Sequence, residues 1–331
     1  MTGAIHPEKV LQELERLWND LGRNQGDEPE EVARACSMTL IVLTDPATEQ
    51  EPASATLAEL MREHPARAII VRVDPRGTSS VEAGVSAQCW RPFGKRQQIC
   101  CEQIEISVSR DSLPDAFTVL PALIAPDVPV VLWFRSGELM NVAPCEAILP
   151  FAAKVLVDSN ELGEPADALE QLERLSASVN VGDLNWTRVT RWRETIAQLF
   201  EMPEYVDRAR LISHVTIRHR TPETPAAAFY LAAWIRRSLS DQVAIEFQRV
   251  EGTSQGKTQS VVLSGADFSI ELRRTGTQCV EMTAGSMTSS TTFPSFSEWQ
   301  LVSKELALLE RDPIHRDVLK LAAIMAREGV R

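Results

Sequence analysis

Two apolar runs, Met-Thr-Leu-Ile-Val-Leu at residues 38–43 and Ala-Ile-Ile-Val-Arg-Val at residues 68–73, decide the fold of this chain. Both runs are rich in β-branched side chains, which is typical of strands buried on both faces. The segment between them, Thr56–His64, has the pattern of a short helix. A strand, a helix and a second strand in this order predict a mostly parallel sheet with helices on both faces.

More strands and helices extend this first region in both directions. Toward the N-terminus, His6–Arg23 has the apolar spacing of an amphipathic helix. Toward the C-terminus, three short runs alternate apolar and polar residues and predict an antiparallel or mixed edge: Val85–Trp90, Gln98–Cys101 and Ile104–Val108. Helix and strand patterns then alternate again, at Leu113–Ala125, Val128–Arg135, Ala147–Ala153 and Lys154–Asp158. Residues 1–175 are therefore predicted to form an α/β domain with a sheet of about five or six strands.

The remaining residues, 176–331, show a different order of elements. Helix patterns at Glu164–Leu175 and Thr190–Phe200 lead into it, followed by a strand at Ser213–His219 and an apolar helix at Pro225–Leu239. Four strand patterns come next, separated by Gly-containing turns: Val243–Val250, Gln259–Ser264, Phe268–Arg274 and Gln278–Ala284. A helical region, Ser297–Arg327, follows with a break expected at Pro313. This order predicts an α+β domain in which helices pack on an antiparallel sheet.

The charge balance narrows the classes of partner. There are 34 basic and 46 acidic residues, a formal net charge of -12, which disfavours nonspecific binding to nucleic acid or to an anionic membrane. The longest apolar stretch, Ala116–Phe134, contains three prolines and Asp127, so a membrane helix is not expected. The first ten residues lack the features of a signal peptide, and the six cysteines form no CxxC pair. We therefore expect a cytoplasmic protein.

One segment matches parts of two active-site motifs. Gly252–Gly256 fits G-x-S-x-G, and Gly256-Lys257-Thr258 resembles the end of a phosphate-binding loop. Both motifs need a helix after the loop, but Gln259–Ser264 has the pattern of a strand. A G-x-G-x-x-G fingerprint is missing, and the five histidines lack the spacing of metal ligands. The sequence therefore predicts no catalytic, cofactor-binding or metal-binding residues.

Three cysteines allow two interpretations. Cys100 and Cys101 are adjacent, and Cys89 lies shortly before them. Adjacent residues in a strand point to opposite faces, which hinders a bond between the two neighbours. Buried cysteines can serve as small apolar side chains. Alternatively, the three are candidate redox thiols, with Cys89 pairing with one of the other two.

Tryptophan and arginine residues recur near the ends of predicted elements. Large aromatic side chains usually pack in the core, but tryptophan and arginine also anchor protein interfaces. The candidates for a partner interface or a domain junction are Trp133, Arg135, Trp186, Arg188, Trp192 and Arg193.

An ordered series of short motifs resembles one known family. These motifs are Ile99-Cys-Cys-Glu-Gln-Ile104, Leu120-Pro-Ala-Leu123, Pro126–Arg135, Val155-Leu-Val-Asp-Ser159, Asp183-Leu-Asn-Trp186, Arg191-Trp-Arg-Glu194 and Gln198-Leu-Phe200. In order and spacing, from about residue 38 onward, the chain resembles the glucose-6-phosphate dehydrogenase assembly protein family (OpcA). The resemblance implies a bacterial accessory protein of carbohydrate metabolism that assembles or allosterically activates this NADP-dependent enzyme of the pentose phosphate pathway. It implies no chemistry of its own.

Two functional hypotheses follow. The first is a noncatalytic protein that binds glucose-6-phosphate dehydrogenase. The second is an α/β enzyme or sensor that binds a sugar phosphate at the carboxyl ends of its parallel strands, where such ligands commonly bind. Those strand ends are Thr44-Asp45, Asp74, Arg135-Ser136-Gly137 and Asp158-Ser159.

Overall fold

The chain folds into two compact units. The computed structural model describes residues 5–23, 32–46, 49, 51–74, 81–92, 97–141, 144, 147–251 and 258–329. Unit 1 comprises Met1–Asp158, Val179–Gly182 and Glu298–Glu310, and unit 2 comprises Ser159–Ser178, Asp183–Ser297 and Arg311–Arg331. This division differs from a single boundary after residue 175. The helix α4 (Pro165–Ser176), which the sequence placed in the first domain, packs against α9 (Pro313–Glu328) and lies in unit 2.

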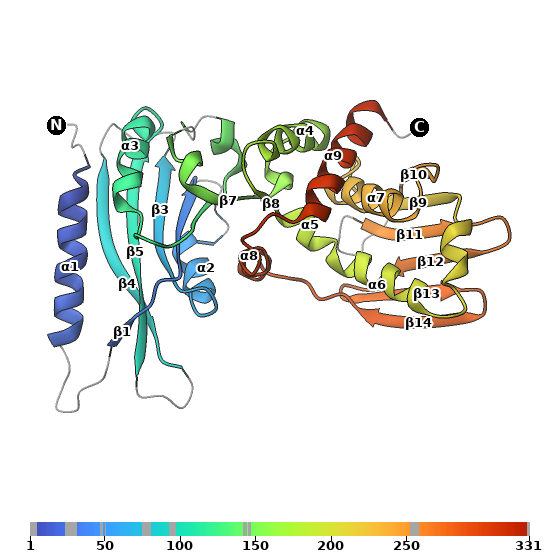
Figure 1. Ribbon diagram of the computed structural model, residues 1–331, viewed down its shortest axis with the longest axis horizontal. Coiled ribbons are helices and arrows are strands. Elements are labelled where there is room, and N and C mark those ends of the chain that lie inside the picture. The colour runs from blue at the N-terminus through green and yellow to red at the C-terminus, as the bar shows by residue number, and fades with distance from the viewer. Residues whose placement is uncertain are drawn as a thin grey trace. The chain divides into compact units, whose positions relative to one another are not determined.

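Unit 1 contains an eight-stranded sheet with the order β1-β5-β3-β2-β6-β7-β8, and β4 pairs with β5 beside this path (Figure 1). Its strands are β1 (Val32–Arg34), β2 (Met38–Thr44), β3 (Ala66–Asp74), β4 (Glu82–Trp90), β5 (Gln98–Ser109), β6 (Val130–Phe134), β7 (Ala152–Val157) and β8 (Val181–Asp183). Its helices are α1 (Pro7–Arg23), α2 (Ala53–Leu60), α3 (Leu113–Leu123) and α8 (Glu298–Leu306), with 3₁₀ turns η1 (Gly137–Asn141) and η3 (Leu149–Phe151).

The central strands follow the order of a dinucleotide-binding Rossmann-type sheet. The pairs β5–β3, β3–β2, β2–β6 and β6–β7 are all parallel. From β2 the chain moves outward through β3 to β5, and it then returns to place β6 on the other side of β2. Because crossovers between parallel strands are right-handed, connections running in opposite directions lie on opposite faces, which puts α2 and α3 on different sides. The predicted parallel sheet with helices on both faces is confirmed.

Several local predictions for unit 1 need correction. The two runs predicted at Gln98–Cys101 and Ile104–Val108 form one strand, β5, and β4 pairs with it in the antiparallel direction expected for a mixed edge. The predicted helix at Ala147–Ala153 is wrong. Residues Leu149–Phe151 form only a 3₁₀ turn containing Pro150, and β7 begins at Ala152 because it pairs with β6. The three-residue strands β1 and β8 were too short to predict.

Unit 2 contains a six-stranded sheet with the order β10-β9-β11-β12-β13-β14. Its strands are β9 (His214–His219), β10 (Ala244–Arg249), β11 (Thr258–Ser264), β12 (Ser269–Arg274), β13 (Cys279–Ala284) and β14 (Met287–Thr292). Its helices are α4, α5 (Leu184–Arg188), α6 (Thr190–Glu201), α7 (Ala226–Leu239) and α9, with 3₁₀ turns η4 (Ser159–Glu161) and η5 (Asp207–Leu211). The predicted α+β unit is confirmed. It differs from the prediction in three respects: β10 and β9 are parallel, and neither strand β14 nor the short helix α5 was predicted.

Alternation along the strands of unit 2 separates a buried face from an exposed face. On β12, Ile270 and Leu272 are fully buried, whereas Ser269 and Arg273 are exposed. The buried positions form a core with α7, most of whose residues are also buried. The C-terminal helical region is broken as predicted at Pro313, where the Asp312 carboxylate caps α9 by accepting hydrogen bonds from the amides of Ile314 and His315.

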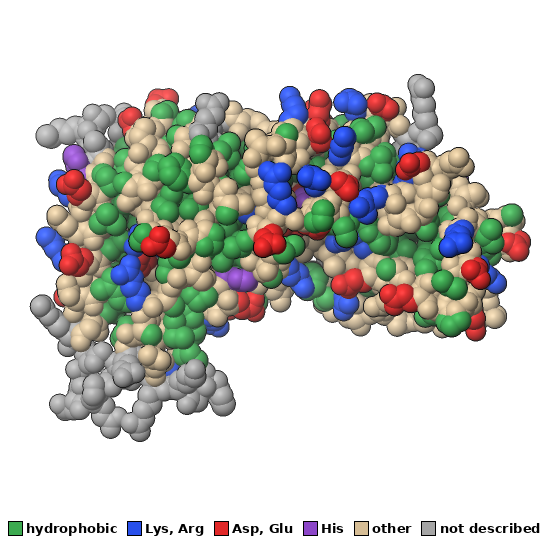
Figure 2. Space-filling view, in the orientation of Figure 1, with side chains coloured by type: hydrophobic (Ala, Val, Ile, Leu, Met, Phe, Trp, Pro, Cys, Tyr) green, Lys and Arg blue, Asp and Glu red, His purple; other side chains and the backbone are tan. Residues whose placement is uncertain are grey.

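The charged side chains and the longest apolar stretch can be located in the structure. On the face shown in Figure 2, basic and acidic side chains are interspersed rather than gathered into a field of one sign. The apolar stretch Ala116–Phe134 divides between α3 and β6. Over the ranges that the structure describes, every helix is too short or too polar to cross a membrane.

Candidate functional site

The first candidate site lies where the strand order of unit 1 reverses, at the carboxyl ends of β2 and β6. In open parallel sheets this switch point is where ligands bind. Thr44 is the last residue of β2, and Arg135 directly follows β6. Glu49 comes from the connection between β2 and α2, and Glu298 is the first residue of α8. We call these residues, together with Arg72 of β3 and Thr56 of α2, the switch-point cluster.

Arg135 is the centre of the switch-point cluster. Its Nε lies 3.0 Å from both carboxylate oxygens of Glu298, and its Nη2 lies 2.8 Å from Glu298 Oε2. Its Nη1 is 3.4 Å from Glu49 Oε1. Glu49 also pairs with Arg72 at 3.3 Å and accepts a hydrogen bond from the Thr44 hydroxyl. The Arg135 side chain is only 7% exposed, so water screens these charges weakly.

This arrangement does not fit a dinucleotide. A Rossmann-type site needs a glycine-rich turn after its first strand, because the backbone must approach the pyrophosphate closely, and a free helix N-terminus to bind the phosphates. Residues 44–52 contain no glycine and three acids, Asp45, Glu49 and Glu51. Glu298 accepts a 3.4 Å hydrogen bond from Thr56 in the first turn of α2. Carboxylates of the chain itself therefore stand where phosphates would bind and would repel them.

The same charges disfavour a sugar phosphate. Among the residues that the structure describes here, Arg135 and Arg72 are the cations that could hold a phosphate at these strand ends. Arg72 is already paired with Glu49 and, at 3.3 Å, with Glu105. Two guanidinium groups thus face three carboxylates, those of Glu49, Glu105 and Glu298. A phosphate would have to displace at least one of these carboxylates before it could bind.

The second candidate site lies in unit 2 around Asp183, which is fully buried. Its Oδ1 accepts hydrogen bonds from the amides of Ser159 (3.1 Å) and Asn185 (2.9 Å), and its Oδ2 accepts one from the Tyr230 hydroxyl (2.8 Å). The bond from Asn185 caps the short helix α5. The Asn185 side chain in turn donates to Ser159 Oγ at 2.7 Å and accepts from Arg188 at 3.2 Å. We call this group the Asp183 cluster.

Trp186 extends the Asp183 cluster with stacked rings. His315 of α9 stacks on its indole with ring centroids 5.3 Å apart and planes at 22°. The guanidinium carbon of Arg193 lies 3.4 Å from the centroid of the same indole. Trp186 Nε1 donates to Asp312 at 3.3 Å, so the ring is fixed by contacts on its faces and on its edge. The hydrogen bonds of the Asp183 cluster and the stacking on Trp186 support a structural role for the segment Asp183–Trp186.

The candidate interface residues differ in how exposed they are. Trp133 lies inside β6 and is 1% exposed, and Arg135 belongs to the switch-point cluster. In unit 2, Trp186 and Trp192 are buried, and Trp192 packs edge-on against Phe293 at 5.0 Å. The three indole rings are therefore core residues in this conformation. Arg193 is half-buried over Trp186, which leaves Arg188 as the exposed candidate.

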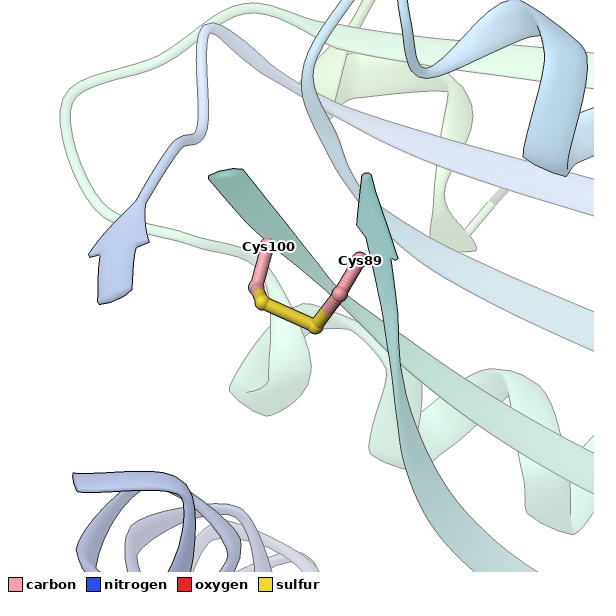
Figure 3. The surroundings of a disulfide bond; sticks show 2 residues. All are labelled: Cys89 and Cys100. Carbon is pink, nitrogen blue, oxygen red and sulfur yellow. A yellow bond between two sulfur atoms is a disulfide. The ribbon is translucent and has the colours of Figure 1, made fainter. Parts of the chain in front are cut away.

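Of the cysteines, Cys89 and Cys100 form a disulfide between β4 and β5 (Figure 3). They are directly opposite in the antiparallel pair, with Cα atoms 4.1 Å apart. Cys101 points to the other face, is buried and free, and burial raises its pKa to about 11. Cys36 and Cys279 are half-buried and free. Free thiols are expected in a reducing compartment such as the cytoplasm, whereas Cys89 and Cys100 form a disulfide.

Two further kinds of reactive centre to consider are the active-site motif at residues 252–258 and a metal-binding group. Residues 252–257 of the motif lie outside the described residues, but Thr258–Ser264 forms strand β11 and not the helix that both motifs require. In the part of the chain that the structure describes, no group of three or more His, Cys, Asp or Glu side chains is placed to hold a metal ion.

Several residues of both clusters were missed by the sequence analysis. Glu49 and Glu298 give Arg135 its partners, and Tyr230 and His315 complete the Asp183 cluster. Glu298 is separated from Arg135 by 163 residues, so no local pattern reveals the pair. A weak signal was the excess of acids after β2, in the turn where phosphate-binding proteins have glycines.

Fold and sites together define a protein with a Rossmann-type unit whose ligand position is occupied by its own side chains, joined to an α+β unit. Residues 57–174 match the glucose-6-phosphate dehydrogenase subunit N-terminal domain, and residues 179–319 match the C-terminal domain of the same subunit. The chain belongs to this family, OpcA.

Curated relatives carry the same family name. The chain is 30% identical over 198 residues to a putative OxPP cycle protein OpcA of Nostoc punctiforme, covering 59% of this chain and 42% of that protein. It is 27% identical over 201 residues to the protein of the same name in Synechocystis, covering 60% of this chain and 42% of the relative. The chain therefore spans less than half the length of the relatives it matches.

Similar solved structures include proteins of low sequence identity. A dehydrogenase (MviM) of Clostridium difficile is 9% identical with a TM-score of 0.41, over 88% of this chain and 98% of that one. The transcriptional regulator Gal80p of Kluyveromyces lactis is 10% identical with a TM-score of 0.45, over 87% of this chain and 88% of that one.

Proposed function

We propose that this chain is a noncatalytic accessory protein that binds glucose-6-phosphate dehydrogenase and promotes its assembly or allosteric activation. The observation that carries the proposal is the match, in order, of both domains of the dehydrogenase subunit family over residues 57–174 and 179–319. In this role the protein acts with the enzyme in the cytoplasm of a bacterium and supports the oxidative pentose phosphate pathway.

The switch-point cluster supports a noncatalytic role. An oxidoreductase built on this fold would need its dinucleotide at the carboxyl ends of β2 and β6. Arg135 binds Glu298 and Glu49 there instead. The fold thus keeps the architecture of a dinucleotide-binding domain, while the residues at its ligand position bind one another.

The effect on the dehydrogenase must come from differential binding. A partner shifts the equilibrium between an inactive and an active assembly only by its difference in affinity for the two. A thousandfold shift requires about 4 kcal/mol, because each factor of ten is worth about 1.4 kcal/mol. An interface of roughly 800 Å² per partner can supply this difference. Arg188, the exposed member of the predicted interface set, is the proposed contact to test first.

The test combines the purified chain with the dehydrogenase of the same organism. We expect a complex by size-exclusion chromatography with light scattering, and an increase in dehydrogenase activity at low glucose 6-phosphate. Arg188→Glu should weaken the effect at least tenfold. Arg191→Glu controls for the charge change, because it makes the same change at an exposed arginine on the following helix. Since Arg188 also donates a hydrogen bond to Asn185, the melting temperatures of both variants are compared to show that each is folded. Identical kinetics and assembly size with and without the chain would refute the proposal.

A thermal-shift assay of the chain alone tests the alternative hypothesis, a sensor that binds a sugar phosphate. Binding of a sugar phosphate must raise the melting temperature. An increase with millimolar glucose 6-phosphate, lost in Arg135→Met, would favour the sugar-phosphate sensor over the accessory role. With three carboxylates around the two arginines, we expect no increase.

A further inference from the structure

The outer strand β14 of unit 2 is an open sheet edge. It is the last strand in the sheet order and pairs with β13. Five of its six residues are exposed. Among the described residues, no strand pairs with its other side. An edge of this kind offers unpaired backbone donors and acceptors to another strand.

The hairpin register shows which backbone groups point outward. The amide of Phe293 donates to the Gln278 carbonyl at 2.9 Å, so residues 278 and 293 form a hydrogen-bonded pair. Hydrogen-bonded pairs recur at every second position of an antiparallel ladder. Continuing the register along β13 and β14 makes Val280–Thr291 and Met282–Ser289 hydrogen-bonded pairs as well. The N–H and C=O groups of the residues between them therefore point away from β13: Thr288, Ser290 and Thr292.

The side chains of β14 do nothing to prevent pairing. Natural proteins protect sheet edges with charges, prolines or bulges. The opposite edge of the same sheet, β10, carries Glu246 and Arg249. The sequence of β14 is Met-Thr-Ser-Ser-Thr-Thr, without a charge or a proline. In a chain with 24% charged residues, this strand is the edge that another strand can approach without electrostatic cost.

We propose that β14 pairs with β14 of a second copy of this chain, antiparallel, about a two-fold axis at Ser290. This register places Ser290 opposite Ser290 of the partner subunit and Thr288 opposite Thr292 of the partner subunit. All three outward residues then fall in hydrogen-bonded positions. The two six-stranded sheets join into one continuous sheet.

An identical strand fits this edge for two reasons. The outward residues are evenly spaced and centred on Ser290, so a two-fold axis there satisfies all of them at once. Homotypic pairing usually risks placing like charges across the axis, which destabilises a sheet. Here only serine and threonine side chains meet, and such cross-strand pairs are favourable. The inference does not depend on binding to the dehydrogenase.

The size of the contact predicts its strength. Six residues span about 20 Å at about 3.4 Å per residue. This strip is smaller than a standard interface of roughly 800 Å² per partner. We therefore expect a concentration-dependent dimer with a dissociation constant on the order of 100 µM.

Sedimentation velocity of the full chain alone, from low micromolar to high micromolar concentration, measures this dimer. Ser290→Lys places two ammonium groups opposite each other at the axis and should weaken association at least tenfold. Ser289→Lys is the matched control, because in this register it faces Thr291 of the partner subunit and creates no like-charge pair. It should leave association within about twofold. Circular dichroism and melting temperature confirm that both variants are folded.

Amide hydrogen exchange by NMR gives a second measurement that needs no variant. At high protein concentration, exchange at Thr288, Ser290 and Thr292 should slow. Ser289 and Thr291, whose amides already bond to β13, should not change. A chain that stays monomeric throughout the concentration range overturns the proposal. So does a dimer that Ser290→Lys leaves intact. If Ser290→Lys abolishes dehydrogenase binding while the chain alone is monomeric, the edge binds the enzyme and self-pairing is wrong.

Discussion

The two units stabilise their buried polar groups in different ways. Unit 1 buries ion pairs: Arg67–Glu102 at 2.6 Å, Lys154–Glu305 at 2.7 Å and Arg135–Glu49 at 3.4 Å all have both side chains less than a tenth exposed. In unit 2, the pairs Arg218–Glu271 and Arg237–Asp317 are about a third or more exposed. Its buried carboxylate, Asp183, accepts neutral donors instead.

The two kinds of buried polar group contribute to stability in different ways. Buried ion pairs cost desolvation and stabilise only when every partner is present. A carboxylate that accepts several neutral hydrogen bonds is stabilised by fixed dipoles and holds separate segments together. In unit 1, ion pairs of Arg135 with Glu49 and Glu298 occupy the position where a ligand would bind. In unit 2, the Asp183 carboxylate joins separate segments by accepting hydrogen bonds from each of them.

Removing the acceptor of unit 2 should have the largest effect. Asp183→Ala leaves the amides of Ser159 and Asn185 and the Tyr230 hydroxyl without this acceptor. Each buried group left unsatisfied costs about 1–3 kcal/mol, so we expect the free energy of unfolding to fall by about 3–5 kcal/mol. Urea unfolding followed by tryptophan fluorescence measures the loss. Tyr230→Phe, which removes one of the three bonds, should cost about 1 kcal/mol. Similar losses for both variants would contradict a central role for Asp183.

Breaking the disulfide should come next and should affect unit 1 selectively. The bond joins residues separated by 11 positions, and closing a loop of this length stabilises the fold by about 3 kcal/mol. A dithiol reductant should therefore accelerate hydrogen exchange in β4 and β5 and leave the strands of unit 2 unchanged. The double variant Cys89→Ser, Cys100→Ser is the control, since it should show the faster exchange without reductant. Equal acceleration in both units would end the contrast.

Arg135→Met tests the switch-point cluster. The change leaves Glu49 with Arg72 as its remaining ion-pair partner, while Glu298, at 36% exposure, can turn to water. We expect a loss of about 2 kcal/mol, below the 3–5 kcal/mol typical of a fully buried pair. Arg62→Met, at an exposed pair with Glu59, is the matched control and should cost less than about 0.5 kcal/mol. Urea unfolding of both variants compares them directly, and equal losses would show that burial of the cluster contributes nothing.

The smallest effect is a pH dependence confined to unit 2. Burial lowers the pKa of His219 below its usual 6.5, against the opposing hydrogen bond to the Thr221 carbonyl. The unfolded chain then binds a proton more readily than the folded one. This contribution to stability is fully present above pH 6.5 and is lost as pH falls toward the lowered pKa. Melting curves between pH 5 and 8 should show a decline that His219→Gln reduces. An unchanged decline would assign it to other groups.

Local patterns predicted much of the fold because the spacing of apolar residues along a segment reflects which of its positions are buried. The strand expected at Met38–Leu43 is β2, one residue longer at Thr44. Alternation along Phe268–Arg274 gave β12 with its buried and exposed faces. Lys154 shows where such patterns fail. A lysine inside a buried strand is explained only by Glu305, which comes from α8 and is separated from it by 151 residues.

The candidate sites were harder to predict for the same reason. Arg135 was identified as a candidate, but its two carboxylate partners come from distant segments. Trp186 and Arg193 were both predicted as interface or junction candidates, but their stacking on each other and that of His315 on Trp186 depend on the packing of α6 and α9. Their burial places the indole rings in the core, which composition and spacing could not distinguish from an exposed interface.

The Lys154–Glu305 pair has a consequence for biosynthesis. Its Nζ donates to the Glu305 side chain and to the carbonyls of Glu305 and Leu308. These acceptors leave the ribosome 151 residues after Lys154, a delay of roughly 8–30 s at 5–20 residues per second. During that interval β7, which lies between β6 and the edge strand β8, carries a positive charge without its partner. All strands of this sheet have been synthesised by Asp183, but β7 keeps an uncompensated charge until α8 follows, a period in which chaperone binding would be most useful.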